Sequence, residues 1–306
     1  MLIALDHGNR QMKSKSKIFT SGIFESDTKP PFGDEVLRYN NRYYSLSDKR
    51  IPYMRDKTMD EKFFILSLFA IAGEIEASGC YKPSSIMPVS IAIGLPPSHF
   101  GTLYKKFEAY FKNRDIIRFE HNNKTYSIRI DDVVCFPQAI AAAWTVFSEI
   151  KQESKVIVLD IGGYTADYVQ MKHGKADFAV CESLEQGVIR LYNDVIKKVN
   201  ADLDILLDES DIDAIIKGQR SNFPANVYTI VYDMATAFVD NLVGMLRERG
   251  VDLRVGKTVF VGGGSILLKR YIDSCKKIGS HIFVEDITAN VKGYELMYQG
   301  SKIDGR

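Results

Sequence analysis

The chain has 306 residues, of which 45% are hydrophobic and 26% charged, and its formal net charge at pH 7 is +1. This near-neutral balance gives no electrostatic reason to expect direct binding to nucleic acid or to an anionic membrane surface. A chain of this length is typical of roughly two domains.

The cysteines and the apolar runs narrow the class of protein further. The four cysteines form no C-x-x-C pair, which argues against a zinc site and favours buried free thiols in a reducing cytoplasm. Residues 1–6 are too short an apolar run for a signal peptide. Another apolar stretch, 63–75, falls short of the ~20 residues that a membrane-spanning helix needs. We therefore expect a cytoplasmic protein without a membrane segment.

The first half of the chain carries two predicted hairpins. Residues 35–46 and 116–130 each surround an Asn-Asn pair, at 40–41 and 122–123. Asparagine tolerates the positive φ that a two-residue hairpin turn requires. A helix is predicted through 63–75, with a capping box of Thr58 and Glu61 at its start and an end at Gly79. A buried strand is predicted at 90–94, and an alanine-rich helix from Gln138 to Ile150.

The second half alternates strands and helices. The strands are predicted at 156–159, 168–171, 259–261 and 281–284, and the helices from a cap of Ser183 and Gln186 to about Asn200, from Pro224 to Gly250, and from Ser265 onward. Mixed strands and helices in both halves predict an α/β protein. The boundary is expected near 145–155, which gives a first domain at 1–150 and a second at 151–306.

Residues 156–167 are the most informative segment. A buried strand there ends in Asp160, and a tight turn with Gly162, Gly163 and Thr165 leads to Asp167. Glycine lets the backbone approach a phosphate closely, and hydroxyl and amide groups can hydrogen-bond its oxygens. Asp160 would supply the carboxylate that a phosphate-bound Mg²⁺ ion needs. The segment therefore predicts a site for phosphate and Mg²⁺.

The same design occurs twice more. Residues 2–13 run from an apolar strand into Asp6 and Gly8, and a third strand ends in the glycines 262–264. A lone Asp-x-Gly is a common turn former, and a lone glycine turn after a strand also occurs in dinucleotide-binding folds. Three such turns, two of them with an aspartate at the same place, predict a phosphate clamp built from two related halves.

Two other phosphate-binding designs are disfavoured. No G-x-G-x-x-G follows the first strand, and acidic side chains would repel a bare pyrophosphate unless a metal ion lay between them. A P-loop is excluded because the chain contains no G-x-x-x-x-G-K-[ST] segment.

Four nearby polar residues have alternative interpretations. Gln138 either orients a water for attack on the γ-phosphate of a nucleotide or is a helix-capping or solvent-facing residue. Lys13 either neutralises phosphate charge or belongs to the solvated lysines of 13–17. Asp167 is either a second water-orienting carboxylate or the start of a strand, and its place in the motif favours the former. His7 is interpreted as a packing residue and not as a catalyst.

The order of these motifs resembles the ParM-type bacterial actin-like proteins, the plasmid-segregation branch of the actin, Hsp70 and sugar-kinase superfamily of ATPases. The resemblance covers nearly the whole chain. The matching segments are 6–13, 43–46, 55–64, 91–96, 107–111, 136–138, 160–167, 183–187, 262–264 and 289–293.

The resemblance implies an actin-like ATPase fold with two related α/β domains, each a mixed sheet flanked by helices, and with ATP (or GTP) and Mg²⁺ in the cleft between them. It also implies that the segment at about 289–306 returns to the first domain. The resemblance implies that Asp6 and Asp160 hold Mg²⁺ through water, and that Gln138 and Asp167 place the attacking water, with Asp160 also catalytic. The residues implied to contact the phosphates are Gly8, Asn9, Lys13, Gly162, Gly163 and Thr165. Those implied to border the nucleoside are Gly187, Gly262, Gly263 and Gly264.

The resemblance further implies a function. Nucleotide binding would favour head-to-tail contacts between copies, which form a filament when they do not close. Hydrolysis would weaken the filament, and a ParR-like DNA-binding adaptor would connect it to plasmid or other low-copy DNA. Two alternatives stay open. One is a sugar or small-acid kinase of the same superfamily, although Gln138 stands where a transferase needs a base. The other is an ATP-driven switch that does not polymerise.

Overall fold

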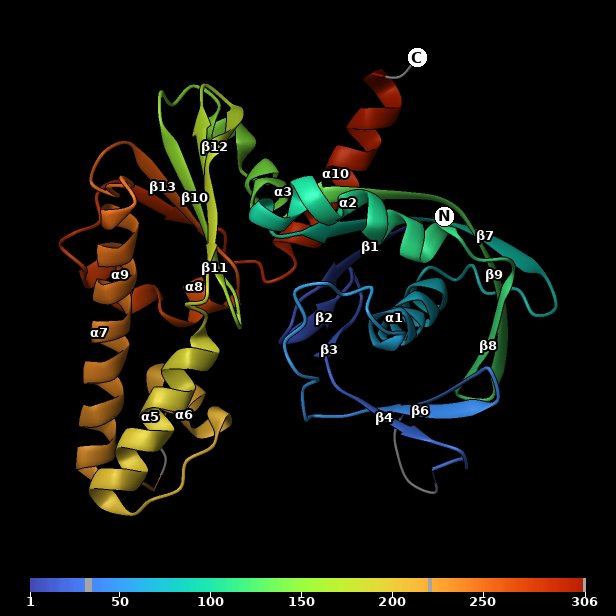
Figure 1. Ribbon diagram of the computed structural model, residues 1–306, viewed down its shortest axis with the longest axis horizontal. Helices are drawn as coiled ribbons and strands as arrows, with labels where there is room; N and C mark the ends of the chain where they lie inside the picture. The colour runs from blue at the N-terminus through green and yellow to red at the C-terminus, as the bar shows by residue number, and fades with distance from the viewer. Residues whose placement is uncertain (31–34, 220–221, 305–306) are drawn as a thin grey trace. The chain divides into compact units, whose positions relative to one another are not determined.

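The structure is a computed structural model that describes residues 1–30, 35–219 and 222–304. The chain forms two compact units (Figure 1). Unit 1 comprises Met1–Thr145 and the C-terminal segment from Thr288, and unit 2 comprises Val146–Ile287. Each unit is built on one mixed sheet with helices packed against it.

Unit 1 contains a sheet of nine strands among its described residues, in the order β3-β2-β1-β7-β9-β8-β5-β6-β4. Strands β1, β7 and β9 are parallel to one another, and the other pairs are antiparallel. The strands are β1 (Leu2–His7), β2 (Gln11–Lys13), β3 (Ile18–Thr20), β4 (Ile23–Ser26), β5 (Val36–Tyr39), β6 (Arg42–Leu46), β7 (Ile86–Leu95), β8 (Ile117–His121) and β9 (Lys124–Pro137).

The central strands of unit 1 are buried on both faces. Ile3 and Leu5 belong to a large apolar cluster with helices α1 (Lys62–Ala77) and α2 (Pro97–Lys112). Ala4 and Ala92 belong to a second cluster with α3 (Ile140–Trp144) and α10 (Ala289–Asp304). Successive residues of a strand point to opposite faces, so β1 is apolar from Leu2 to Leu5, where it fills both clusters.

Both Asn-Asn hairpins are confirmed. β5 pairs with β6 and β8 pairs with β9 in antiparallel register. Asn40, Asn41, Asn122 and Asn123 all have a positive φ, as the two-residue turn requires.

Helix α1 begins without the predicted capping box. The backbone N–H and the hydroxyl of Thr58 both donate to Oδ1 of Asp56, so Thr58 does not cap the helix. The N-cap residue is Glu61, which makes no side-chain capping bond. The predicted end is correct, because Gly79 has a φ of +68° and its N–H donates to the carbonyl of Glu76.

The alanine-rich segment is not one helix, and this prediction was wrong. Helix α3 ends at Trp144, and α4 (Phe147–Ile150) is a separate helix in unit 2. Gln138 precedes α3 and lies outside its first turn. The reason is sheet pairing: β9 continues to Pro137, and the N–H of Gln138 donates to the carbonyl of Leu95 in β7.

Unit 2 contains a five-stranded sheet among its described residues, in the order β12-β11-β10-β13-β14. β10, β13 and β14 are parallel, and β10, β11 and β12 are antiparallel. The strands are β10 (Val156–Ile161), β11 (Ala166–Lys172), β12 (Lys175–Leu184), β13 (Lys257–Val261) and β14 (His281–Phe283). The helices besides α4 are α5 (Val188–Leu203), α6 (Glu209–Ile216), α7 (Ala225–Glu248), α8 (Gly263–Leu267) and α9 (Lys269–Ser274).

Unit 2 contains the predicted helices and, between α5 and α7, a helix that was not predicted, α6. The long helix after Pro224 is confirmed as α7. The cap predicted from Ser183 and Gln186 is wrong, because β12 continues to Leu184 and keeps Ser183 in the sheet. Gly187 is the N-cap residue of α5, and it makes no side-chain capping bond.

Two further findings concern the class of protein. Among the described residues, no helix has the length and apolar character that a membrane crossing requires. All four cysteines are free thiols, and Cys135 is buried as expected. Cys80 is exposed, so the expectation of buried thiols was wrong at that position.

Candidate functional site

The first aspartate turn lies in unit 1, between β1 and the antiparallel β2. Asp6 is 3% exposed. Its Oδ1 accepts a hydrogen bond from Nε2 of Gln138 at 2.8 Å, and its Oδ2 accepts one from Nζ of Lys13 at 3.3 Å. A buried carboxylate is costly unless it is paired and hydrogen-bonded, and this one is both. The contacts exclude the solvent-facing interpretation of Gln138 and the solvated interpretation of Lys13.

Gly8 and Asn9 form the bend of this turn. A Cβ at Gly8 would lie 2.6 Å from the carbonyl oxygen of Gln11, so a side chain does not fit there. The hydroxyl of Ser21 donates to the carbonyl of Gly8 at 2.5 Å. Oδ1 of Asn9 is buried and has no hydrogen-bond partner among the described residues. Since the oxygen and nitrogen of an amide can exchange places, a phosphate that accepts from the Asn9 amide would satisfy this group.

His7 packs in the core beside the first turn. Its ring lies 5.2 Å and 5.4 Å from the rings of Phe107 and Phe111, and its Nε2 is 2.8 Å from Oγ of Ser67. Burial, and then the positive charge of Lys57, lower the pKa of His7 to about 3. The ring is therefore neutral near pH 7, which agrees with the packing role expected from the sequence.

The second aspartate turn lies in unit 2, between β10 and the antiparallel β11. Asp160 and Asp167 are buried and lie directly opposite each other in this pair of strands. The hydroxyl of Thr165 donates to Oδ2 of Asp167 at 2.9 Å, and the N–H of Gly162 donates to the carbonyl of Thr165 at 2.8 Å. The turn is thus closed by its own backbone, and its hydroxyl orients one of the two acids.

The backbone of the second turn is docked on the start of α5. The N–H groups of residues 187–189 donate to the carbonyls of 162–164 at 2.9 to 3.1 Å. These are N–H groups that a helix cannot satisfy internally. A Cβ at Gly187 would lie 2.3 Å from the carbonyl oxygen of Gly163. The absence of a side chain at Gly187 is therefore what allows the turn and the helix to meet.

The third glycine turn follows β13, the parallel neighbour of β10. Gly262 has a φ of +88°, and a Cβ there would lie 2.1 Å from Oδ1 of Asp160. A Cβ at Gly264 would lie 2.6 Å from the carbonyl oxygen of Ile161, whereas one at Gly263 would meet no atom within 4 Å. Unit 2 thus brings Asp160 and the second and third turns together at the carboxyl ends of two parallel strands.

The residues of both aspartate turns fit a Mg²⁺-bound phosphate. Carboxylate oxygens are the protein ligands that Mg²⁺ accepts, and glycine backbones that exclude a Cβ allow close approach of phosphate. In unit 1 the structure brings together Asp6, Gly8, Asn9, Lys13 and Gln138. In unit 2 it brings together Asp160, Gly162, Gly163, Thr165, Asp167, Gly187, Gly262, Gly263 and Gly264.

Sequence reasoning missed one buried polar residue near the first turn. Asn290, in the first turn of α10, accepts a hydrogen bond at its Oδ1 from the N–H of Ala139 at 3.1 Å. The family-like segment 289–293 contains it, but nothing in the sequence connects it with a residue 151 positions earlier.

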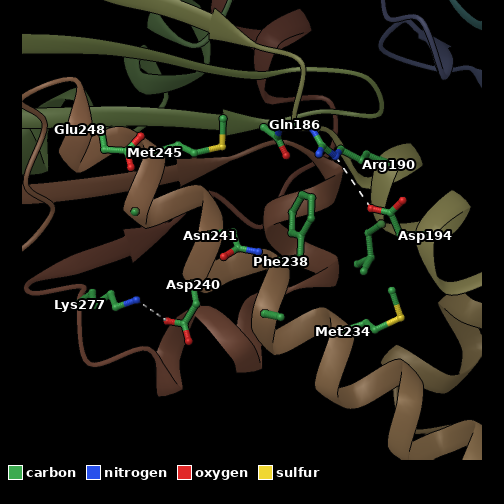
Figure 2. Close-up of a pocket in the computed structure, with 13 residues that line it drawn as sticks. Gln186, Arg190, Asp194, Met234, Phe238, Asp240, Asn241, Met245, Glu248 and Lys277 are labelled. Carbon is green, nitrogen blue, oxygen red and sulfur yellow. Dashed lines mark ion pairs between the residues drawn. The ribbon is translucent and has the colours of Figure 1, made fainter. Parts of the chain in front are cut away.

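Unit 2 also has a groove of about 560 Å³ that follows α7 beside α5 (Figure 2). Its lining includes apolar side chains and two ion pairs, Arg190–Asp194 and Lys277–Asp240. None of the residues of the second and third turns lines this groove. It is therefore a separate surface feature and not part of the candidate phosphate site.

Two protein-family models match the chain. The model described as the N-terminal domain of actin-like proteins matches residues 4–140, and the model described as the C-terminal part of archaeal MreB-like actin homologues matches residues 158–274. The first range contains Asp6 and Gln138, and the second contains Asp160 and Gly264. A search of curated proteins found no match.

Solved structures share the architecture at low sequence identity. The archaeal actin homolog Ta0583 in complex with ADP is 17% identical, with a TM-score of 0.74 and coverage of 98% of this chain and 99% of that one. ParM of Bacillus thuringiensis with ATP is 13% identical, with a TM-score of 0.66 and coverage of 99% of each chain. The AlfA filament, from Bacillus subtilis plasmid pLS32, is 14% identical, with a TM-score of 0.63 and coverage of 97% and 98%.

The chain has the actin-like fold. The predicted α/β architecture, with one mixed sheet per half and flanking helices, is therefore confirmed. Within this fold the two aspartate turns fall one in each matched range, which is the arrangement that the repeated sequence motif predicted.

Proposed function

We propose that this actin-like protein binds and hydrolyses ATP (or GTP) with Mg²⁺, and that the nucleotide controls its assembly into filaments. The observation that carries the proposal is a repeated local structure. In each unit an aspartate near the end of a buried strand precedes a glycine turn, the chain returns as an antiparallel strand, and the other neighbour of the first strand is parallel. Two copies of one phosphate-binding design are best explained by a ligand with several phosphates.

The residues of unit 1 would bind phosphate and place a water. Lys13 supplies positive charge, and Gly8 and Asn9 supply a close backbone and an amide. Because Nε2 of Gln138 already donates to Asp6, its Oε1 is the atom left to accept a hydrogen bond from an attacking water. Asp6 would thus hold Gln138 in one orientation. Its contact with the metal, through water, would be weaker than that of Asp160 because Lys13 already neutralises its charge.

The residues of unit 2 would bind phosphate and the metal. The backbone of 162–165 would form the cradle, and Asp160 would hold Mg²⁺ through its waters. When bound, Mg²⁺ neutralises charge that develops on the phosphoryl oxygens. Asp167, oriented by Thr165, would accept a proton or a hydrogen bond from water. Gly262–Gly264 would border the nucleoside, with the open side of Gly263 toward it.

Assembly and its role extend the proposal beyond the site. AlfA, which shares the fold, forms a filament, and head-to-tail contacts that do not close generate such polymers. We propose that this chain forms filaments that segregate plasmid or other low-copy DNA in the cytoplasm. Its net charge of +1 favours attachment to DNA through a basic adaptor protein of the ParR type over direct binding.

Right-angle light scattering of the purified protein tests the proposal. We expect scattering to rise above a critical protein concentration with Mg²⁺-ATP, to decay as phosphate is released, and to persist with a non-hydrolysable analogue. The variant Gln138→Ala should assemble like the native chain but decay more slowly. Scattering that stays flat at every concentration, with ATP bound, would overturn filament formation. Turnover that needs an added sugar would indicate a kinase, and turnover independent of protein concentration would indicate a switch.

A further inference from the structure

The backbone next to Gln138 adopts a strained turn. Ala139 has a φ of +61° and a ψ of −54°, and the N–H of Ile140 donates to the carbonyl of Gln138 at 2.6 Å. A hydrogen bond that spans only three residues with these angles is a γ-turn of the rare, strained kind. A non-glycine residue in such a conformation costs energy and persists only when its surroundings hold it there.

Helix α10 supplies the contacts that hold this turn. Oδ1 of Asn290, a residue only 8% exposed, accepts from the N–H of Ala139 at 3.1 Å. One turn later, a Cβ at Gly293 would lie 1.9 Å from the carbonyl oxygen of Ala141. The hydrogen bond is therefore made where α10 and the segment after Gln138 are in direct backbone contact, which fixes the position of the acceptor.

A second contact anchors the same helix to the strand that receives Gln138. A Cβ at Gly94 would lie 2.1 Å from the hydroxyl oxygen of Tyr294, so the tyrosine ring lies directly on β7. The next residue, Leu95, accepts the N–H of Gln138 at 2.8 Å. The strained turn is thus held at one end by β7 and in its middle by Asn290.

We infer that Asn290 is a positioning residue for Gln138. It stabilises the positive φ of Ala139, and this conformation aims the Gln138 side chain at Asp6. Without Asn290, Ala139 would relax toward a negative φ, and Gln138 would lose its contact with Asp6. The inference rests on the proposed role of Gln138 in nucleotide hydrolysis.

Single-turnover phosphate release, measured beside nucleotide affinity, tests this inference. For Asn290→Ala we expect release about tenfold slower, as a small misplacement of a catalytic group commonly produces, and a Kd for ATP within about twofold of the native value. Asn290→Asp keeps an acceptor oxygen and should recover part of the rate. The exposed residue Gln299 of the same helix provides the control, because Gln299→Ala should change neither quantity.

Two combined variants separate positioning from a general structural effect. In Asn290→Ala/Ala139→Gly, glycine tolerates the positive φ without a clamp, so the release rate should move back toward the native value. In Asn290→Ala/Gln138→Ala, release should be no slower than in Gln138→Ala alone, because residues that act through one group are not additive. If the double variant is slowed by the product of the two single reductions, Asn290 acts independently of Gln138 and the inference is overturned.

The failure of the inference differs from the failure of the proposed function. If the native chain binds ATP but releases no phosphate, the proposed hydrolysis fails. If the native chain releases phosphate and a folded Asn290→Ala variant does so at the same rate, the proposed function stands and the role of Asn290 is wrong. Thermal unfolding of each variant distinguishes a folded chain with a slow site from a chain that has lost its structure.

Discussion

The two aspartate turns share a backbone design but differ in the residue opposite the acid. In unit 1 the partner of Asp6 across the hairpin is Lys13, and the two side chains form an ion pair. In unit 2 the partner of Asp160 is a second acid, Asp167. Like charges directly opposite each other in a sheet are destabilising. In unit 1 Lys13 therefore neutralises the carboxylate of Asp6. The comparison supports the proposal that the cation site lies mainly in unit 2.

The turns also differ in what holds the backbone. The first depends on side chains from distant parts of the chain, since Gln138 reaches Asp6 across 132 positions. The second depends on backbone contacts with α5 and on the absence of a side chain at Gly187. The first turn is therefore adjustable by single side chains, and the second is fixed by packing.

The largest expected effect is on stability and concerns the residue after each aspartate. This residue is His7 in unit 1 and the apolar Ile161 in unit 2. Because the folded-state pKa of His7, about 3, lies below its ordinary value of 6.5, the unfolded chain binds the proton first. The free energy of unfolding should therefore fall as the pH drops from 6.5 to about 3, by about 5 kcal/mol in total. In His7→Leu this contribution should vanish, as measured by urea unfolding at several pH values.

His173, which is exposed, provides the control for this pH effect. His173→Asn should show the same pH dependence as the native chain. An unchanged pH dependence in a folded His7→Leu variant would show that His7 is not buried in its neutral form.

The second prediction concerns the packing of the turn in unit 2. Gly187→Ala places a Cβ against the backbone of Gly163, and we expect a loss of about 3 kcal/mol in the free energy of unfolding. Gly244→Ala, in α7 and with no atom within 4 Å of the added Cβ, should leave stability unchanged or slightly raised. Equal stability of the two variants in thermal unfolding would contradict the docking of the turn on α5.

The third prediction concerns the ion pair in unit 1. Lys13→Met leaves the buried carboxylate of Asp6 without its cation, and we expect a loss of about 2 kcal/mol, less than for a fully buried pair because Lys13 is partly exposed. Lys15→Met, at an exposed position, should have no measurable effect. If both variants unfold at the same denaturant concentration as the native chain, Asp6 does not depend on Lys13.

The residues of both turns could be predicted from the sequence because their pattern is local. Strand, acid and glycine follow one another within a dozen positions, and the repeat of that pattern identified Asp6 and Asp160 together. The Asn-Asn hairpins could be predicted for the same reason, since two positive-φ residues specify the turn.

The predictions that were wrong concern elements whose limits depend on contacts between distant segments. The alanine-rich segment has high helix propensity, but pairing of β9 with β7 extends to Pro137 and displaces the helix start. The prediction of a helix cap at Ser183 was wrong because this residue pairs with Asp167 of β11 as part of β12. Asn290 could not be assigned a role, because its partner Ala139 is 151 positions away and its conformation is invisible in the sequence.

The difference between the two turns can be tested most directly by calorimetric titration of ATP with and without Mg²⁺ into two variants, Asp6→Asn and Asp160→Asn. We predict that Mg²⁺ tightens ATP binding to the native chain and to Asp6→Asn, and that Asp160→Asn loses at least about tenfold of this enhancement, equivalent to about 1.4 kcal/mol. An enhancement by Mg²⁺ in Asp160→Asn as large as in the native chain would contradict the assignment of the cation site to unit 2.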